Sequence, residues 1–252
     1  MSFNVLKVCA KTTGCYPAIR WLYRQLLNRE ELRRFHAETV FYSQFVHPGQ
    51  ICFDVGANFG AKTEAFLRIG ATVVAFEPQK DCFMEMVARL GKNPRLIAIN
   101  AAVGSRSGEQ TLYVENHRTA SSLIKHWQGE IVGTVKVPVK TLDEAIAQHG
   151  QPQYCKIDVE GYEMEVLKGL SRLIPFVSYE YHLRQNGAQT AIDCLDYLSQ
   201  FGELLVNISP AEMPILARQE WWSKEKFIEF FHNEIPHMPE FNYGDIFVRT
   251  LI

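Results

Sequence analysis

From position 51 onward, short apolar runs bounded by glycine, proline or polar residues alternate with segments whose apolar positions recur every three or four residues. The runs predict buried strands, and the periodic segments predict amphipathic helices. This alternation predicts an α/β fold, a doubly wound and mostly parallel sheet covered on both faces by helices. The predicted strands span residues 51–55, 71–77, 95–103, 154–159, 176–181, 203–208 and 245–251. The predicted helices span residues 61–69, 81–90, 142–149, 163–170 and 188–201.

Three segments precede or interrupt this alternation. Residues 1–50 predict a helical extension packed on the core, with an amphipathic helix near 19–27 whose polar face is basic. The remaining residues, 51–252, form the main domain, with insertions near 104–140 and 209–243. The first insertion holds a turn and two extra strands. The second is rich in aromatic residues, which we expect to pack beneath it, with a lid over a cleft as the less favoured alternative.

Composition excludes several classes of protein. The chain has 252 residues, 47% of them hydrophobic, and a formal net charge of −2. It therefore has no strong positive field to attract nucleic acid. Its six cysteines contain no C-x-x-C pair, which predicts a reduced, cytoplasmic setting. No apolar stretch reaches the length of a membrane span, so we expect no transmembrane segment.

The turn after the first predicted strand carries the main chemical signal. It contains Gly56 and Gly60, which let the backbone approach a ligand at the carboxyl edge of the sheet, and the polar Asp54 and Asn58. Glu77 ends the second predicted strand, 21 residues after Gly56. That spacing suits an acid that accepts hydrogen bonds from two ribose hydroxyls, so the pattern predicts a nucleoside-containing ligand.

Two other nucleotide motifs nearly fit the same turn. A dinucleotide fingerprint needs glycine where this chain has Asn58 and Ala61. A P-loop fails only because Ala61 replaces its second glycine before Lys62 and Thr63. A P-loop hydrolase therefore remains the main alternative, although Asp54 would add negative charge beside its phosphates.

Four motifs resemble the FkbM family of methyltransferases. They are F-D-V-G-A-N-F-G at 53–60, A-F-E-P at 75–78, N-A-A-V-G at 100–104 and K-I-D-V-E-G-Y-E-M-E-V-L-K-G-L at 156–170. The resemblance implies a Rossmann-like class I methyltransferase fold that binds S-adenosylmethionine, with about seven strands and an antiparallel last strand. It also implies O-methylation of a sugar, a glycan or a natural product, so the expected partner is a small-molecule or carbohydrate acceptor.

The resemblance also assigns residues to the parts of the cofactor and to the acceptor. Ser121 and Ser122 match a serine pair that the family tends to show in its insertion, and are expected to bind the substrate. The implied cofactor residues are Asp54, Gly56, Asn58 and Gly60 at the methionine end, Glu77 at the ribose, and Asn100 and Ala101 at the adenine.

Catalytic residues are expected where two neighbouring predicted strands end. Residues two apart on a strand share a face, so Asp158 pairs with Glu160, and Glu180 pairs with His182. Methyl transfer to an alcohol needs alignment and proton removal, and His182 has the best unperturbed pKa to act as the base. The same four groups could hold a divalent cation, but we favour a site without metal.

Three functions therefore stay open at the sequence level. We favour an S-adenosylmethionine-dependent O-methyltransferase over a P-loop hydrolase. A non-catalytic cofactor-binding scaffold is the third hypothesis, in which the acidic strand ends perform no chemistry.

Overall fold

A computed structural model describes residues 29–116, 121–125, 127, 129–184, 187–211 and 213–251. The amphipathic helix expected near residues 19–27 lies outside the described residues. The first described helix, α3 (Arg29–Tyr42), and the residues after it bury Phe41, Tyr42, Phe45 and Val46 against helix α4 and the sheet.

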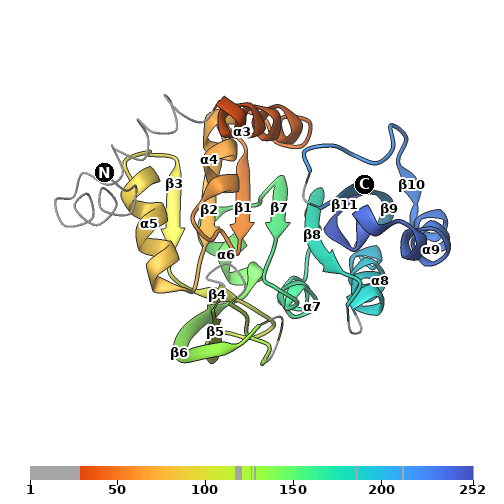
Figure 1. Cartoon of the computed structure of the whole chain (residues 1–252). Coiled ribbons are helices and arrows are strands. Elements are labelled where there is room, and N and C mark those ends of the chain that lie inside the picture. Colours follow the sequence, from red (N-terminus) through yellow and green to blue (C-terminus); the bar gives the residue numbers. More distant parts are fainter. Residues whose placement is uncertain are drawn as a thin grey trace.

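One eight-stranded sheet organises the fold, in the order β10-β9-β11-β8-β7-β1-β2-β3 (Figure 1). The strands from β8 to β3 in this order are parallel to their neighbours, whereas β11 runs antiparallel to both β8 and β9. The strands are β1 (Ile51–Val55), β2 (Thr72–Phe76), β3 (Leu96–Ile99), β7 (Tyr154–Ile157), β8 (Phe176–His182), β9 (Glu203–Pro210), β10 (Trp222–Ser223) and β11 (Tyr243–Leu251). The predicted fold class and the antiparallel last strand are confirmed.

The predicted number of strands was one too low. The extra strand, β10, has only two residues and pairs at the edge of the sheet with Leu205 and Val206 of β9. A segment this short has no hydrophobic periodicity from which a strand could be predicted.

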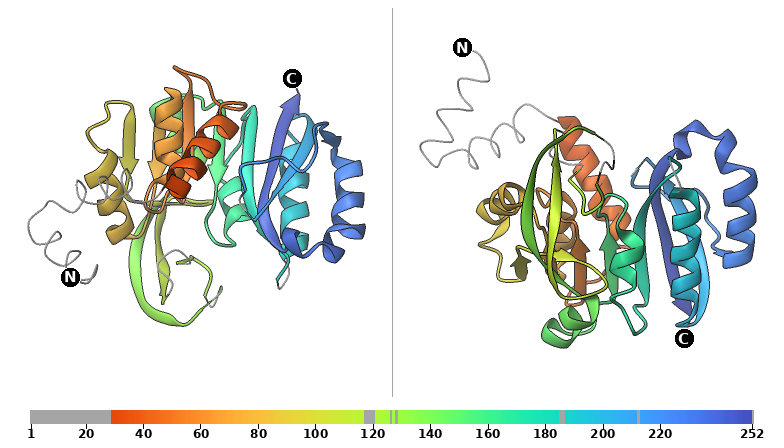
Figure 2. Two further views of the ribbon diagram at one scale, coloured as in Figure 1. Left: turned by 45° about the horizontal axis from the view of Figure 1, so that its top comes forward. Right: turned by 90° about the horizontal axis from the view of Figure 1, so that it is seen from below.

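Helices cover both faces of the sheet because neighbouring side chains on each strand point to opposite sides. On β1, Cys52 faces α3, α4 and α5, while Phe53 and Val55 face the cluster that includes α6 to α9. Figure 2 shows α3, in red-orange, lying across the first of these faces. The helices are α4 (Ala61–Ile69), α5 (Lys80–Leu90), α6 (Leu142–His149), α7 (Glu163–Leu167), α8 (Gly187–Ser199) and α9 (Lys224–Asn233), with short 3-10 turns η1 (Ile235–His237) and η2 (Pro239–Phe241).

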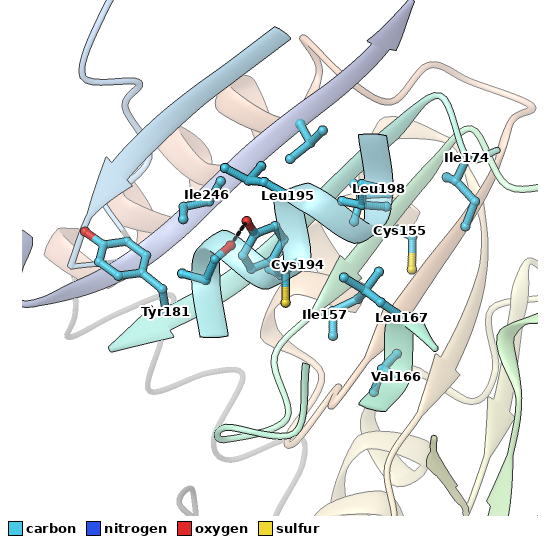
Figure 3. Close-up of a cluster of buried hydrophobic side chains, with 14 of the residues drawn as sticks. Cys155, Ile157, Val166, Leu167, Ile174, Tyr181, Cys194, Leu195, Leu198 and Ile246 are labelled. Carbon is cyan, nitrogen blue, oxygen red and sulfur yellow. Dashed lines mark hydrogen bonds between the residues drawn. The ribbon is translucent and has the colours of Figure 1, made fainter. Parts of the chain in front are cut away.

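The larger core lies between α8 and strands β7, β8 and β11. Leu195 and Leu198 of α8 meet Ile157 of β7 and Ile246 of β11, all buried (Figure 3). The hydroxyl of Tyr179, on β8, donates a hydrogen bond of 2.7 Å to the Ala191 carbonyl, which satisfies a buried polar group inside this core. These contacts fix α8 against the end of β8, where His182 lies.

The first insertion builds a small second sheet beyond the carboxyl ends of β1 and β2 (Figure 1). It consists of β4 (Ala102–Val103), β5 (Gly108–Glu115) and β6 (Ile131–Lys140), in the order β4-β6-β5. The single strand predicted over 95–103 is therefore wrong. The chain turns at Asn100, whose side chain bonds to the carbonyls of Glu77 and Pro78 instead of continuing the ladder.

The aromatic residues of the second insertion mostly serve packing. Trp222, Phe227, Phe231 and Phe241 are buried in the larger core, which disfavours an aromatic lid. Tyr243 is the exception, with 41% of its surface exposed, and it begins β11 opposite His182, the last residue of β8.

Candidate active site

The turn after β1 has a backbone that only small residues can form. Gly56 has φ +83°, and a Cβ atom there would lie 1.7 Å from the Asp158 carbonyl oxygen. Asn58 also has a positive φ, at 50°. Gly60 has φ +78° and is the N-cap residue just before α4, and a Cβ there would lie 2.6 Å from the Met86 side chain. The turn therefore brings its backbone close to the turn that follows β7.

Buried polar side chains on β1 and α4 stabilise this turn. Asp54, 1% exposed, accepts a hydrogen bond of 2.5 Å from the Thr63 hydroxyl and lies beside Lys156 in the strand register. Burial raises the pKa of Asp54, although Lys156 and the Thr63 hydrogen bond oppose the rise. Asp54 thus anchors α4 to β1 and also lines the cavity above.

Glu77, which follows β2, binds the backbone of the same turn. Its two carboxylate oxygens accept hydrogen bonds from the backbone N–H groups of Asn58 and Gln79, both 2.7 Å long. Burial raises the pKa of Glu77 to about 7 in spite of these bonds. Because each carboxylate oxygen has a further lone pair, Glu77 can still accept hydrogen bonds from a ligand.

These elements enclose a cavity of about 400 Å³ at the carboxyl edge of β1, β2 and β7. Its size suits a nucleoside-sized ligand, since ligand pockets typically measure about 300–1,000 Å³. The Oδ1 atom of Asn58 is buried at this cavity and has no hydrogen-bond partner among the described residues. Of the predicted cofactor residues, Asp54, Gly56, Asn58, Glu77 and Ala101 line it.

Two of the predicted cofactor residues occupy supporting positions instead. Gly60 is the N-cap residue of α4 and packs on Met86. Asn100 holds the loop after β2 through two hydrogen bonds from its amide nitrogen, 2.8 Å and 3.1 Å long. Neither residue lines the cavity, whereas Ala101 beside Asn100 does.

The four predicted catalytic residues gather at the adjacent ends of β7 and β8. Lys156 is buried and its Nζ lies 2.6 Å from an Asp158 oxygen. His182 Nε2 lies 3.2 Å from an oxygen of Glu180. One donor atom each from Glu160, Glu180 and His182 lies within 4.8 Å of the other two, so the cluster also has the dimensions of a metal site.

The geometric argument that placed Asp158 and Glu160 on one face of a strand was wrong. β7 ends at Ile157, and Glu160 lies in a turn with φ +56°. Three contacts hold this left-handed conformation. Ser122 donates a hydrogen bond of 2.7 Å to the Glu160 carbonyl, while Glu163 accepts bonds of 3.2 Å and 3.1 Å from the N–H groups of Val159 and Gly161.

Electrostatics gives the members of the cluster different protonation states. Burial alone would raise the pKa of Asp158, but the Lys156 ammonium and a hydrogen bond from Glu180 bring it below its usual value. Burial and the neighbouring carboxylates, Asp158 first, raise the pKa of Glu180 well above its usual value. Burial lowers the pKa of His182. These shifts favour the ionised form of Asp158, the protonated form of Glu180 and the neutral imidazole of His182, which can accept a proton.

Three residues of the site were not predicted from the sequence. Lys156 and Glu163 are the first and last residues of the K-I-D-V-E-G-Y-E motif, so this motif is the sequence signal that could have identified them. Trp127, from the insertion before β6, donates a hydrogen bond of 3.0 Å from Nε1 to Glu160. No sequence pattern links Trp127 to Glu160, which lies 33 residues away.

The serine pair lies at the boundary between the cavity and the catalytic turn. Ser121 and Ser122 both line the cavity. Ser122 is buried and braces Glu160, as described above, while the buried hydroxyl of Ser121 has no hydrogen-bond partner among the described residues. Ser121 is therefore the one of the pair better placed to contact a ligand.

The P-loop alternative finds no support in the turn. Lys62 Nζ lies 3.2 Å from a Glu38 oxygen and above the ring of Tyr42. The Thr63 hydroxyl, which would bind magnesium in a P-loop, is fully buried and donates to Asp54.

Comparison with known proteins identifies similar sequences and folds. The family described as the methyltransferase FkbM domain matches residues 54–210. Hexuronic acid methyltransferase AglP from Haloferax volcanii is 24% identical over 164 residues, 63% of this chain and 63% of that protein. The match thus spans less than two thirds of that relative's length.

Solved structures are similar to this chain at low sequence identity. A Clostridium thermocellum protein assigned as an rRNA methylase has a TM-score of 0.50 and 9% identity, covering 87% of this chain and 96% of that one. Precorrin-6y C5,15-methyltransferase from Geobacter metallireducens has a TM-score of 0.45 and 9% identity, covering 84% of each chain. Within the described part of the chain, no helix has both the length and the apolar character needed to span a bilayer.

Proposed function

Because the chain belongs to the FkbM methyltransferase family, we propose that it transfers the methyl group of S-adenosylmethionine to a hydroxyl oxygen of a sugar, glycan or similar natural product. The observation that carries this proposal is the juxtaposition of a nucleoside-sized cavity with a cluster of two glutamates and a histidine whose side-chain ligand atoms lie within 4.8 Å of one another. The relative named for hexuronic acid supports a carbohydrate acceptor.

The cavity residues fit the cofactor in three places. Asp54 and the unpartnered Oδ1 of Asn58 would bind its amino-acid end, where the glycine turn leaves the backbone open. Glu77 would accept hydrogen bonds from the ribose hydroxyls, and Ala101 would border the adenine. S-adenosylmethionine supplies a methyl group on a sulfonium: as the carbon–oxygen bond forms, the carbon–sulfur bond breaks and S-adenosylhomocysteine leaves.

The acidic cluster removes the proton of the acceptor hydroxyl and orients that hydroxyl. His182 takes the hydroxyl proton on its imidazole, which is neutral at pH 7 because burial lowers its pKa. The raised pKa of Glu180 favours a hydrogen-bond donor and the lowered pKa of Asp158, beside Lys156, favours an acceptor, and together they would orient the hydroxyl. Glu160 is fixed by Ser122 and Trp127 at the side of the cofactor cavity.

A thermal-shift comparison tests the cofactor assignment. S-adenosylhomocysteine is expected to raise the melting temperature, and ATP with magnesium is expected to have no effect, because a ligand that binds only the folded state stabilises it. Stabilisation by ATP–magnesium alone would support a P-loop hydrolase and reject the proposal. Binding of S-adenosylhomocysteine without turnover of any hydroxylated acceptor would instead indicate a scaffold.

Glu77 should make cofactor binding both strong and dependent on pH. We expect Glu77→Ala to weaken S-adenosylhomocysteine binding by about 1.5–3 kcal/mol, since charged hydrogen bonds are lost. The ionised carboxyl accepts from the ribose, and its pKa is raised to about 7. Affinity should therefore approach its full value above about pH 8 and fall as pH drops through 7, by at most roughly tenfold per pH unit. Calorimetry between pH 6 and 8 measures this.

The control for this titration is Glu77→Gln, which keeps the size of the side chain but cannot ionise. Its affinity should be low at every pH, and the profile should be flat. A flat profile for the unaltered protein would mean that Glu77 does not bind the ribose.

A test of metal dependence distinguishes two roles for His182, as a general base or as a metal ligand. We expect chelation with EDTA to leave the rate of methyl transfer unchanged, because the proposed base needs a neutral imidazole without a bound cation. Loss of activity with EDTA and its recovery with magnesium or manganese would show that Glu160, Glu180 and His182 hold a metal ion. His182 would then be a ligand and not the base.

A further inference from the structure

Lys62 places a positive charge at the cofactor cavity, beside the glycine turn. It is the second residue of α4 and lines the cavity together with Ala61 and Asn58. In a P-loop the lysine of such a turn would bind phosphate, but this cavity has the carboxylates of Asp54 and Glu77 in its lining, which disfavour a phosphate group. The lysine therefore needs a different anionic partner.

Helix α3 holds the Lys62 side chain in place. Its Nζ lies 3.2 Å from an oxygen of Glu38 and 5.7 Å from the centre of the Tyr42 ring, and both α3 residues are buried. Among the described residues, the bond to Glu38 is the one hydrogen bond that this ammonium donates. An ammonium has three N–H donors, so Lys62 can donate to a ligand while its contacts with α3 stay in place.

The charge of Lys62 acts inside the cavity. Burial raises the pKa of Asp54, and the positive charges of Lys156 and Lys62 oppose that rise. At Asp158 burial again raises the pKa, but Lys156, Lys62 and hydrogen bonds together bring it below its usual value.

Only two lysines are among the described residues that line the cavity, and they differ in what surrounds them. Lys156 lies 2.6 Å from Asp158, pairs with Asp54 in the strand register, and has 2% of its side chain exposed. Lys62 has 13% of its side chain exposed. Lys156 therefore already neutralises protein carboxyls within the cavity, and Lys62 is the lysine better placed to bind an anion of a ligand.

The start of α4 adds backbone donors at the same place. The first N–H groups of a helix have no intrahelical partner, and the helix dipole gives this end a partial positive charge. The N-cap residue of α4 is Gly60, which has no side chain that could accept from them. Ala61 and Lys62, the first two residues of the helix, line the cavity. An anion here would meet both the Lys62 ammonium and these N–H groups.

We propose that Lys62, together with the N-terminus of α4, binds the carboxylate of the amino-acid end of S-adenosylmethionine, and that Glu38 and Tyr42 position the lysine. This inference rests on the proposed function, because it concerns the cofactor of the same reaction. That end of the cofactor carries an ammonium and a carboxylate. Asp54 and the Oδ1 atom of Asn58 are acceptors and suit the ammonium, so the carboxylate requires donors, which Lys62 and the helix supply.

A pair of ligands that differ only in the carboxylate tests this assignment. The probes are S-adenosylhomocysteine and decarboxylated S-adenosylhomocysteine, which keeps the nucleoside, the sulfur and the amine, and calorimetry measures both affinities. We expect the unaltered protein to bind the first ligand about tenfold or more tightly than the second, since charge-assisted hydrogen bonds are lost without the carboxylate. Lys62→Met keeps the length of the side chain but removes its charge, so it should lower this affinity ratio by about tenfold.

Two further variants serve as controls for the charge. Lys62→Arg should keep most of the ratio, because the cation remains. Lys224→Met should leave the ratio unchanged, since Lys224 is likewise an ion-paired lysine, 3.0 Å from Asp196, but lies outside the lining of the cofactor cavity.

A double variant protects the test against a loss of stability. Lys62→Met removes a cation from beside the buried carboxyl of Glu38, which could destabilise the fold. Lys62→Met combined with Glu38→Gln removes both charges and should show the same fall in the ratio. A purely structural role of Lys62 would weaken the two ligands equally, because each variant is compared with itself.

The outcomes distinguish this inference from the proposed function. If the unaltered protein binds both ligands equally well, or if the ratio is unchanged in the single and double variants, the carboxylate does not bind Lys62 and the inference is wrong. Binding of S-adenosylhomocysteine in those cases would still agree with the proposed cofactor. If the unaltered protein binds neither ligand, the cofactor assignment and the inference are both wrong.

Discussion

Replacing His182 with alanine should slow methyl transfer by about 10²–10⁴-fold while leaving the affinity for S-adenosylhomocysteine nearly intact, because the variant loses a general base. That loss corresponds to roughly 3–5 kcal/mol in the activation barrier. His182 lies at the end of β8 with Nε2 3.2 Å from Glu180, outside the lining of the cofactor cavity. His182→Ala should therefore slow the chemical step without weakening cofactor binding. Single-turnover rates and calorimetry measure the two effects.

The pH profile adds a readout that a structural role would not change. Burial lowers the pKa of His182, so the imidazole is neutral at pH 7 and becomes protonated only in acid. The rate for the unaltered protein should fall as pH drops through that lowered pKa, and this acid limb should be absent in His182→Ala. His149→Ala is the matched control, since burial also lowers the pKa of His149, which lies at the end of α6 outside the cofactor cavity. If His182→Ala slows transfer by no more than the control does, the cluster is structural.

Alanine at Gly56 should be far more damaging than alanine at Gly49, although the two glycines have the same φ of +83°. A Cβ at Gly56 would lie 1.7 Å from the Asp158 carbonyl oxygen, whereas a Cβ at Gly49 meets no atom within 4 Å. Both variants carry the strain of a left-handed residue, about 1–2 kcal/mol. Gly56→Ala must also displace the turn after β7, so its free energy of unfolding should fall by about 3 kcal/mol or more.

Denaturant unfolding of the two variants measures the difference, and calorimetry with S-adenosylhomocysteine adds the functional consequence. Because the displaced turn carries Asp158 and Glu160, Gly56→Ala should also lose most of its cofactor affinity. Gly49→Ala should keep it. Equal destabilisation of the two proteins would show that the turns after β1 and β7 can separate at little cost, which contradicts the geometry of the site.

Most of the fold was accessible from the sequence because local signals agree with the tertiary structure. The bounds predicted for β1, α4 and α6 match the structure, since glycine or a capping threonine marks their ends. Thr141, for example, caps α6 in a reciprocal pair with Glu144. The bend at Asn100 and the two-residue strand β10 escaped prediction, because tertiary hydrogen bonds and edge pairing decide them.

The residues of the site likewise include some that the sequence predicts and some that it does not. The glycine turn after β1 and Glu77 could be predicted from their spacing along the chain. Each follows a parallel strand, and the carboxyl ends of parallel strands lie side by side. The left-handed Glu160 could not be predicted, because it depends on Ser122 and Glu163 closing around it. Trp127 comes from an insertion whose docking no local pattern specifies, and its contacts with Glu160 and His182 exist only in the folded chain.

Transfer of an isotopically labelled methyl group tests the central claim most directly. The protein would be incubated with S-adenosylmethionine carrying a carbon-13 methyl group and with a panel of methyl hexosides and other hydroxylated sugars, and the products would be examined by mass spectrometry and NMR. The account predicts a sugar that gains one labelled methyl on oxygen, formed together with S-adenosylhomocysteine, and about 10²–10⁴-fold less of it with His182→Ala. A label found on nitrogen or carbon, or a product formed equally fast by the variant, would contradict it.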